Sequence, residues 1–398
     1  MSFYRKHGPH HALCVGIVVL CALTEPSYAQ LKTDPNTLYL IAGGNRANGR
    51  FNQPAGVVRQ GTGGEPYLLV ADSQNHVIRK INKEGFVLPF AGVLGKCGYA
   101  NEGVFKEGRG DRIPFCNPVG IAADTLGNLY IADRESHLVR MSTPSGLVTI
   151  LAGNGKPGHA DAIGERAQFR NPGGIAVDSA RNVYVDDTGN HVIRKIAPDG
   201  RVSTVAGRVG ICDSKIGYAS NSASFCSPTG LAIDKAGSLY IADTGNNQIR
   251  KIVLRDPDGS EKKEVAIENL AGAPYSLVGP KLEVKENTCN LSWVAQDRDG
   301  YFCTPVGIAI DDRSQLLYVA DFGNSAIRKI NLASIGPPDV STVIGGWKFD
   351  GNLREKITPK TQLGVLPKQI AAPLGLAVLE SGRLVITTAD NEVLGLNF

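Results

Sequence analysis

One short phrase recurs along the chain and limits its fold more than any other feature. The phrase reads Phe-x-x-Pro-x-Gly followed by two apolar residues. Five full copies begin at Phe51, Phe115, Phe169, Phe225 and Phe302, and a degenerate sixth spans residues 371–378. Each full copy is followed by a Tyr, an apolar run that ends in Asp, a basic segment such as 77–81 (VIRKI), and an apolar run that ends in Gly. Such ordered repetition indicates one repeat domain.

Every phrase has the character of a β-strand. Short runs of β-branched and aromatic residues alternate with Gly, Asn, Asp and Pro, and no long segment has helical periodicity. Turn residues at 126–128 and 236–238 separate the first and second strands, and those at 188–190 and 244–246 separate the second and third. Four antiparallel strands in each unit, repeated radially, are typical of the blade of a β-propeller. The sequence therefore predicts an all-β propeller.

The start of the third strand resembles the NHL repeat, which is named for Asn-His-Leu. The matching triplets are Asn75-His76-Val77, Ser136-His137-Leu138, Asn190-His191-Val192 and Asn246-Asn247-Gln248. The resemblance covers residues 37–398 apart from insertions. It implies a six-bladed propeller of four-stranded NHL-type blades.

The two ends of the repeat region complement each other. Residues 371–398 supply three strands, at 374–378, 384–387 and 392–396, and the missing fourth phrase stands at residues 37–44. We therefore expect the N-terminal strand to complete the last blade and close the ring, which removes exposed strand edges. The predicted organisation is a signal peptide at 1–29, a short segment at 30–36 and a single propeller domain at 37–398.

The first residues have the pattern of an export signal. Arg5 and Lys6 precede an apolar run at 11–23, and small residues at 27 and 29 mark a cleavage site before Gln30. A lipoprotein signal at Cys21 is the alternative, but Leu20 is too large for that cleavage. No later run is long enough to span a membrane, so we expect a secreted or periplasmic protein. The near balance of 42 Lys and Arg against 38 Asp and Glu argues against nucleic acid as a partner.

Six cysteines remain after the signal, and no Cys-x-x-Cys motif occurs among them. An even number in an exported chain indicates disulfides. Three occupy the slot after the repeat Phe, and equivalent slots on different blades are too far apart for a bond. We therefore predict the local pairs Cys97–Cys116, Cys212–Cys226 and Cys289–Cys303.

Five Asp–Arg pairs lie seven residues apart across the second hairpin, which places both side chains on one face of the sheet. We interpret them as structural ion pairs, with ligand contact as the alternative, because five blades cannot share one active site. The pairs are Asp72/Arg79, Asp133/Arg140, Asp187/Arg194, Asp243/Arg250 and Asp321/Arg328.

Other polar residues have a structural and a functional interpretation. His76, His137 and His191 occupy one repeat position on three blades, too far apart for a shared metal, and are expected to pack in turns. Asp186 replaces an Ala of the other full repeats, either by drift at an exposed edge or as a functional departure. Carboxylates at the far ends of the inner strands are expected to bond their own turns, or alternatively to form a weak calcium site: Asp124, Asp178, Asp234 and Asp311.

The residues by which each unit exceeds four strands lie mostly between the Ala-Gly phrase and the next Phe, on the face that carries the Asn-His turns.

The inner strands begin without histidine or carboxylate, and Arg59 is their single charge. Amidating lyases that resemble NHL propellers carry a His after this Pro, and propeller lactonases use carboxylate and amide ligands near the axis. We therefore expect a monomeric recognition module for a protein or glycan, with no cofactor except a possible structural calcium. A metal-dependent lactonase or lyase is the alternative. Asn290 begins a glycosylation sequon.

Overall fold

The structure is a computed structural model. It describes residues 37–43, 50–61, 66–98, 107–218, 223–256, 258–272, 302–334, 339–345, 364–365 and 370–397. The expected signal peptide, the segment at 30–36, Cys289 and the sequon at Asn290 lie outside these ranges. Within the described ranges, no helix is long and apolar enough to cross a membrane.

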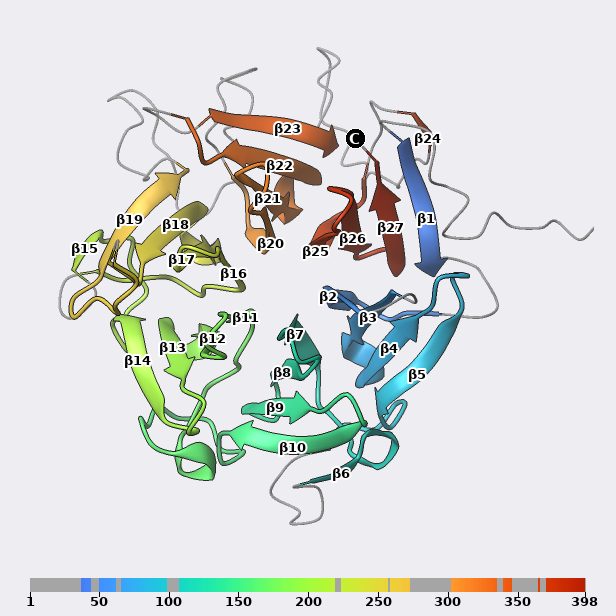
Figure 1. Ribbon diagram of the computed structural model, residues 1–398, viewed down its shortest axis with the longest axis horizontal. Helices are drawn as coiled ribbons and strands as arrows, with labels where there is room; N and C mark the ends of the chain where they lie inside the picture. The colour runs from blue at the N-terminus through green and yellow to red at the C-terminus, as the bar shows by residue number, and fades with distance from the viewer. Residues whose placement is uncertain are drawn as a thin grey trace, which may run out of the picture.

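Six antiparallel sheets surround a central axis as the blades of a propeller (Figure 1). Blade 1 contains β2 (Pro54–Gln60), β3 (Tyr67–Asp72), β4 (Val77–Ile81) and β5 (Val87–Gly92). Blade 2 contains β7 (Pro118–Ala123), β8 (Leu129–Asp133), β9 (Leu138–Ser142) and β10 (Leu147–Ala152), with β6 (Glu107–Arg109) outside β10. Blade 3 contains β11 (Ile175–Val177), β12 (Val183–Asp187), β13 (Val192–Ile196) and β14 (Val202–Gly207).

The remaining blades follow the same order from the axis outward. Blade 4 contains β16 (Gly230–Ile233), β17 (Ser238–Asp243), β18 (Gln248–Val253) and β19 (Ala266–Ala271), with β15 (Gly217–Tyr218) outside. Blade 5 contains β20 (Pro305–Asp311), β21 (Leu316–Asp321), β22 (Ala326–Asn331) and β23 (Asp339–Gly345). Blade 6 contains β25 (Pro373–Val378), β26 (Leu384–Thr388) and β27 (Glu392–Leu396), then β1 (Thr37–Gly43) and β24 (Gly364–Val365). The predicted six-bladed fold is confirmed.

The N-terminal strand closes the ring, as the split sixth unit predicted. β1 pairs antiparallel with β27, and Tyr39 lies opposite Gly395. A Cβ on Gly395 would overlap the Tyr39 ring, so glycine is required at a third-strand position where blades 1 to 5 carry a lysine or, in blade 2, Met141. Because Leu38 joins a core shared with blade 5 and Tyr39 joins one shared with blade 1, β1 holds both neighbours of blade 6.

The hydrophobic core lies between the blades. In one cluster Leu69 and Ile78 of blade 1 pack against Phe115, Ile121 and Ile131 of blade 2. The repeat Phe is buried in every full copy, which explains its recurrence at the entrance to each blade. Faces of neighbouring sheets therefore stabilise each other around the whole ring.

Alternation of strand direction creates two distinct ends of the propeller. We call one end the loop face; it carries the turns between the second and third strands and the described parts of the connections between blades, at 93–98, 107–117, 153–171, 208–218 and 223–227. The opposite end, the hairpin face, carries the remaining turns, including the one between β7 and β8. An extra segment at 254–265 of blade 4 also lies there, closed by a bridge between Arg255 and Glu261.

Candidate functional site

The five Asp–Arg pairs are in contact inside the blades, beneath the loop face. In blade 2 the Nε of Arg140 lies 2.8 Å from Oδ2 of Asp133, and both side chains are fully buried. The other carboxylate oxygen, Oδ1, accepts the backbone N–H of Cys116 at 2.6 Å. Equivalent pairs span 2.8 to 3.5 Å in the other four blades: Asp72–Arg79, Asp187–Arg194, Asp243–Arg250 and Asp321–Arg328.

Electrostatics favours a structural role for these pairs. Burial raises the pKa of Asp243 and of Asp321 to about 6, while hydrogen bonds and the paired arginine lower it. Both carboxylates therefore remain mostly ionised at neutral pH. Each one ties the residue after the repeat Phe to the second hairpin of its own blade, so the pairs define blade geometry on five separate blades.

The NHL histidines form hydrogen bonds from one blade to the next. Nδ1 of His76 accepts the backbone N–H of Asn117 at 3.1 Å. His137 accepts from Asn171 at 3.1 Å and His191 accepts from Ser227 at 3.0 Å. The donors all precede the repeat Pro and have a positive φ of 47–58°. We call this bond the interblade latch.

Asparagine makes the same latch at two other junctions. Oδ1 of Asn247 accepts from Thr304, and Oδ1 of Asn391 accepts from Gln53, both at 2.7 Å. The sequence predicted turn packing for the histidines but not a bond to the neighbouring blade. The presence of Asn247 at the histidine position of blade 4 was a signal for this bond, because the amide oxygen of asparagine can accept the same hydrogen bond as the imidazole Nδ1.

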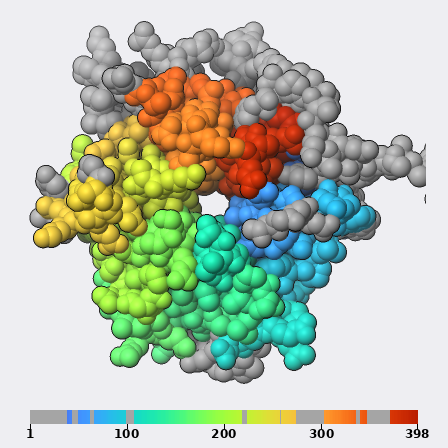
Figure 2. All heavy atoms as spheres, viewed as in Figure 1, coloured from blue at the N-terminus to red at the C-terminus, as the bar shows by residue number. Residues whose placement is uncertain are grey.

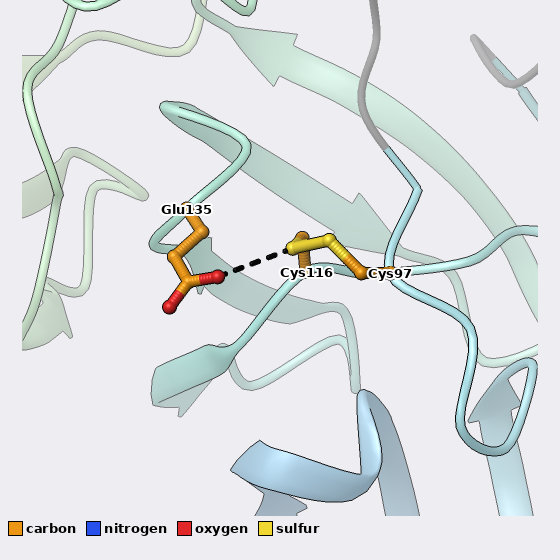
Figure 3. A group of neighbouring side chains, drawn as sticks. All are labelled: Cys97, Cys116 and Glu135. Atoms are coloured by element: carbon orange, nitrogen blue, oxygen red, sulfur yellow. Dashed lines mark hydrogen bonds between the residues drawn. A yellow bond between two sulfur atoms is a disulfide. The ribbon is translucent and has the colours of Figure 1, made fainter.

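Disulfides hold the connections on the loop face. Cys97–Cys116 and Cys212–Cys226 have Cα–Cα distances of 4.3 and 4.2 Å and are the local pairs that the spacing indicated. Cys303 is also disulfide-bonded. Glu135 Oε2 lies 3.4 Å from Cys116 Sγ (Figure 3). These three residues form the single cluster of metal-ligand side chains in the described part of the chain, but bonded sulfurs offer no thiolate to a metal.

Two of these connections expose apolar side chains at equivalent positions. Leu94 is 65% exposed, and Val209 and Ile211 are 47% and 39% exposed. Each turn contains a glycine with φ of 72°. The N–H of Gly95 bonds the carbonyl of Asn75, and that of Gly210 bonds the carbonyl of Asn190, each at 3.0 Å. Both turns are thus fixed by a backbone bond and by the disulfide that follows.

Glycines of the Pro-x-Gly phrase surround the axis. A Cβ added to Gly56 would lie 2.5 Å from the Val119 carbonyl oxygen of the next blade. Comparable contacts exist around the ring, at Gly120, Gly174, Gly230, Gly307 and Gly375. Glycine recurs because the inner strands approach each other too closely for a side chain.

A cavity of about 280 Å³ lies at the axis and opens on the loop face; Figure 2 shows a hollow at the centre of the ring. Aliphatic side chains and glycine backbone line its walls, and its polar lining residues are Gln53, Ser73, Gln74, Asn117, Arg134 and Thr229. Arg134 is the charged member of this lining among the described residues. Arg59, the predicted inner-strand charge, instead pairs with Glu380 at 2.5 Å beside a separate pocket between blades 1 and 6.

Asp186 lies beside this cavity. Of its two interpretations from the sequence, drift at an exposed edge is wrong. The side chain is completely buried. Its Oδ2 accepts the N–H of Gly174 at 2.5 Å and its Oδ1 accepts the hydroxyl of Thr188 at 2.6 Å. Burial raises its pKa to about 7, with these two hydrogen bonds and Arg134 lowering it and Asp187 raising it. A carboxyl that titrates near neutral pH is typical of functional sites.

The weak calcium candidates bond their own turns. Oδ1 of Asp124 accepts the N–H groups of Leu126 and Asn128, both at 2.9 Å, and Oδ2 accepts the Tyr130 hydroxyl at 3.0 Å. Their equivalents bond the backbone of their own turns in the same way: Asp178, Asp234 and Asp311. These hydrogen bonds favour the interpretation that the four carboxylates stabilise their turns over the interpretation that they bind calcium.

Known proteins share both the repeat and the architecture. The sequence profile of the NHL repeat matches residues 115–140, 225–252 and 302–330. NHL repeat-containing protein 2 of Bos taurus is 32% identical over 50% of this chain and 29% of its own length. Teneurin-4 of Mus musculus is 30% identical over 56% of this chain and 8% of its own length. A gluconolactonase from Xanthomonas campestris superposes with a TM-score of 0.52 at 13% identity, covering 94% of this chain and 96% of its own.

These similarities have different weight. Three segments of the chain match the NHL repeat, and the structure is a six-bladed propeller. The matches cover less than a third of both curated relatives, so their activities do not transfer to this chain. The likeness to the gluconolactonase shows a shared fold and nothing about chemistry.

Proposed function

We propose that this protein is an exported recognition module that binds a protein or glycan partner through its loop face. The observation that carries the proposal is the exposure of Leu94, Val209 and Ile211 on turns that are each held at two points. Preordered apolar side chains lose little entropy on binding, so they are suited to anchor a partner. NHL repeats in the relatives are consistent with an interaction module.

Export is part of the proposal. Disulfides persist mainly in oxidising compartments, and two lie wholly within the described residues. Together with the signal-like segment at 1–29, they support a secreted or periplasmic location. We further propose that residues 37–398 act as one monomeric domain and that nucleic acid is not the partner.

The channel lining gives the metal-dependent alternative no specific support. Its described residues include neither histidine nor carboxylate, whereas lactonase- or lyase-like chemistry on a propeller needs such groups near the axis. Metal analysis of the purified protein, followed by lactonase and lyase assays, tests this alternative. Stoichiometric zinc with turnover that a chelator abolishes would support it.

The test of recognition is capture of a partner from the protein's own extracellular medium. We compare the wild-type protein with a variant carrying Leu94→Ser, Val209→Ser and Ile211→Ser. Leu126→Ser is the matched control, because Leu126 is 63% exposed on the hairpin face. We expect the triple variant to lose the partner and the control to retain it. Equal capture by all three proteins would contradict the loop face as the binding surface.

A further inference from the structure

The corner of the axial cavity between blades 2 and 3 departs from the internal repeat. At the position after the Asp of the Asp–Arg pair, Ser73 donates to the carbonyl of Pro118 at 2.6 Å and Thr244 donates to that of Pro305 at 2.7 Å. Blade 2 instead carries Arg134, which is half-buried and lines the cavity. Its guanidinium makes no hydrogen bond or ion pair within 4 Å with another described residue. It is therefore a cation available to a ligand.

Two further departures lie next to it in blade 3. Asp186 stands where the other full repeats have Ala, and Gly173 stands where the other five blades have a residue with a Cβ. A Cβ on Gly173 would lie 2.7 Å from Thr188 Oγ1 and closer still to Asp186 Oδ1. Gly173 thus makes room for the Asp186 carboxyl. Three linked changes at one corner indicate a site that differs from the structural pattern of the ring.

We propose that Arg134 binds a carboxylate group that enters the axial cavity from the loop face. The planar guanidinium can pair with both oxygens of a carboxylate. Gln53 and Gln74 on the rim offer amide donors and acceptors to neighbouring polar groups of the ligand, and the aliphatic wall accepts its carbon skeleton. The site goes beyond the recognition function proposed above, because a small acid can occupy it without a macromolecule on the loop face.

The charges around Arg134 select a monoanion. A single guanidinium faces the cavity, and the buried Asp186 opposes further negative charge close by. Glu135 is not among the residues that line the cavity; its Oε1 accepts from Nδ2 of Asn117 at 3.0 Å and its Oε2 lies against Cys116. A doubly charged phosphate would therefore be bound less well than a carboxylate.

Ligand binding and protonation of Asp186 are coupled in this arrangement. A bound carboxylate adds negative charge near Asp186 and offsets the positive charge of Arg134, and both effects favour the neutral carboxyl. The neutral form keeps its bonds, because Gly174 still donates to Oδ2 while the Thr188 hydroxyl accepts the new proton. The negative charge of Asp187 favours neutrality as well. Binding should therefore take up a proton and tighten as the pH falls from 8 to 6.

The probe is acetate. Its binding is measured by NMR as a shift of the side-chain Nε resonance of Arg134 in protein labelled with ¹⁵N-arginine. A second arm uses a short peptide with one Glu and its Gln counterpart, which distinguishes a free acid from a protein side chain as the source. We expect Arg134→Gln to weaken binding about tenfold or more, as the loss of a charge-assisted hydrogen bond predicts. Arg59→Gln is the matched control, because Arg59 lies outside the cavity.

The pH arm uses Asp186→Asn, which keeps a hydrogen-bonding side chain at this position without a titrating carboxyl. Its affinity for acetate should be independent of pH between 6 and 8, whereas the wild-type affinity should rise toward pH 6. No response of Arg134 to either probe, or equal affinity in Arg134→Gln, would overturn the proposal. Partner capture by Arg134→Gln separates this site from recognition, because loss of acetate with retained capture leaves the loop-face proposal intact.

Discussion

Burial decides what the individual charged residues of this propeller do. Asp133 and Arg140 sit fully inside blade 2 and organise the backbone, whereas Arg134, one residue from Asp133, is half-buried and faces a cavity. The same residue types thus stabilise the blade in one place and present charge to a ligand in another.

At this scale we predict that Arg140→Met destabilises the protein by about 3–5 kcal/mol, because it leaves the Asp133 carboxylate buried without its partner. Urea unfolding measures the loss. The control is Arg201→Met, whose partner Asp199 forms an ion pair at the surface, and there we expect no measurable change. Equal stability of Arg140→Met and wild type would show that the pair is dispensable.

The interblade latch belongs to the scale of the structural element. A turn of one blade accepts the N–H of the residue that enters the next, and the role is filled by histidine at three junctions and asparagine at two. The histidine must be unprotonated at Nδ1 to accept. Burial and the charge of Arg170 lower the pKa of His137 and of His191, while Glu135 raises that of His137.

A lowered folded-state pKa means that the neutral latch contributes stability above the unfolded pKa of about 6.5. That contribution is lost as the pH falls through the folded values. We therefore predict that, between pH 7.5 and pH 5, acid lowers the unfolding free energy of the wild type relative to that of a variant in which His137 and His191 are replaced with Asn. Urea unfolding at both pH values is the measurement.

The chain provides its own controls for this prediction. Asn247→His should add acid sensitivity at a junction that now lacks it. His159 is present in all the variants and its pKa is also lowered by burial, so some pH dependence remains. A variant with both His137 and His191 replaced that keeps the full wild-type pH dependence would show that the latches do not sense acid.

At the scale of the whole molecule, stability depends on closing the ring. β1 pairs with β27 and contributes side chains to the cores on both sides of blade 6. The Tyr39 ring lies against Gly395, where blades 1 to 5 carry a lysine or a methionine. Without β1, the edge of β27 and two core clusters would be exposed to water.

We predict that a chain beginning at Arg50 aggregates or melts at a markedly lower temperature than one beginning at Thr37. Exposed strand edges pair with other chains, and the loss of buried Leu38, Tyr39 and Ile41 removes apolar contacts. Thermal unfolding and light scattering measure the two effects. A chain from Arg50 that is monomeric and melts like the longer one would refute closure by β1.

The sequence by itself determined the number of blades, their strand order and the closing strand, because these follow from a repeat whose copies and split unit can be counted. Both disulfides of the described residues join the local cysteines that the spacing indicated. The recurring glycine was visible too, although its reason, the close approach of inner strands, was not.

The tertiary structure decided everything that depends on which residues meet across neighbouring blades. His76 and Asn117 are far apart in the chain, and only the ring brings the turn of one blade to the entrance of the next. Asp186 was visible as an anomaly, but its burial depends on the packing of blade 3 beside Gly174 and Arg134. The inner-strand position of Arg59 suggested a channel residue and the turn position of Arg134 did not, since strand direction and twist decide which side chain faces the axis.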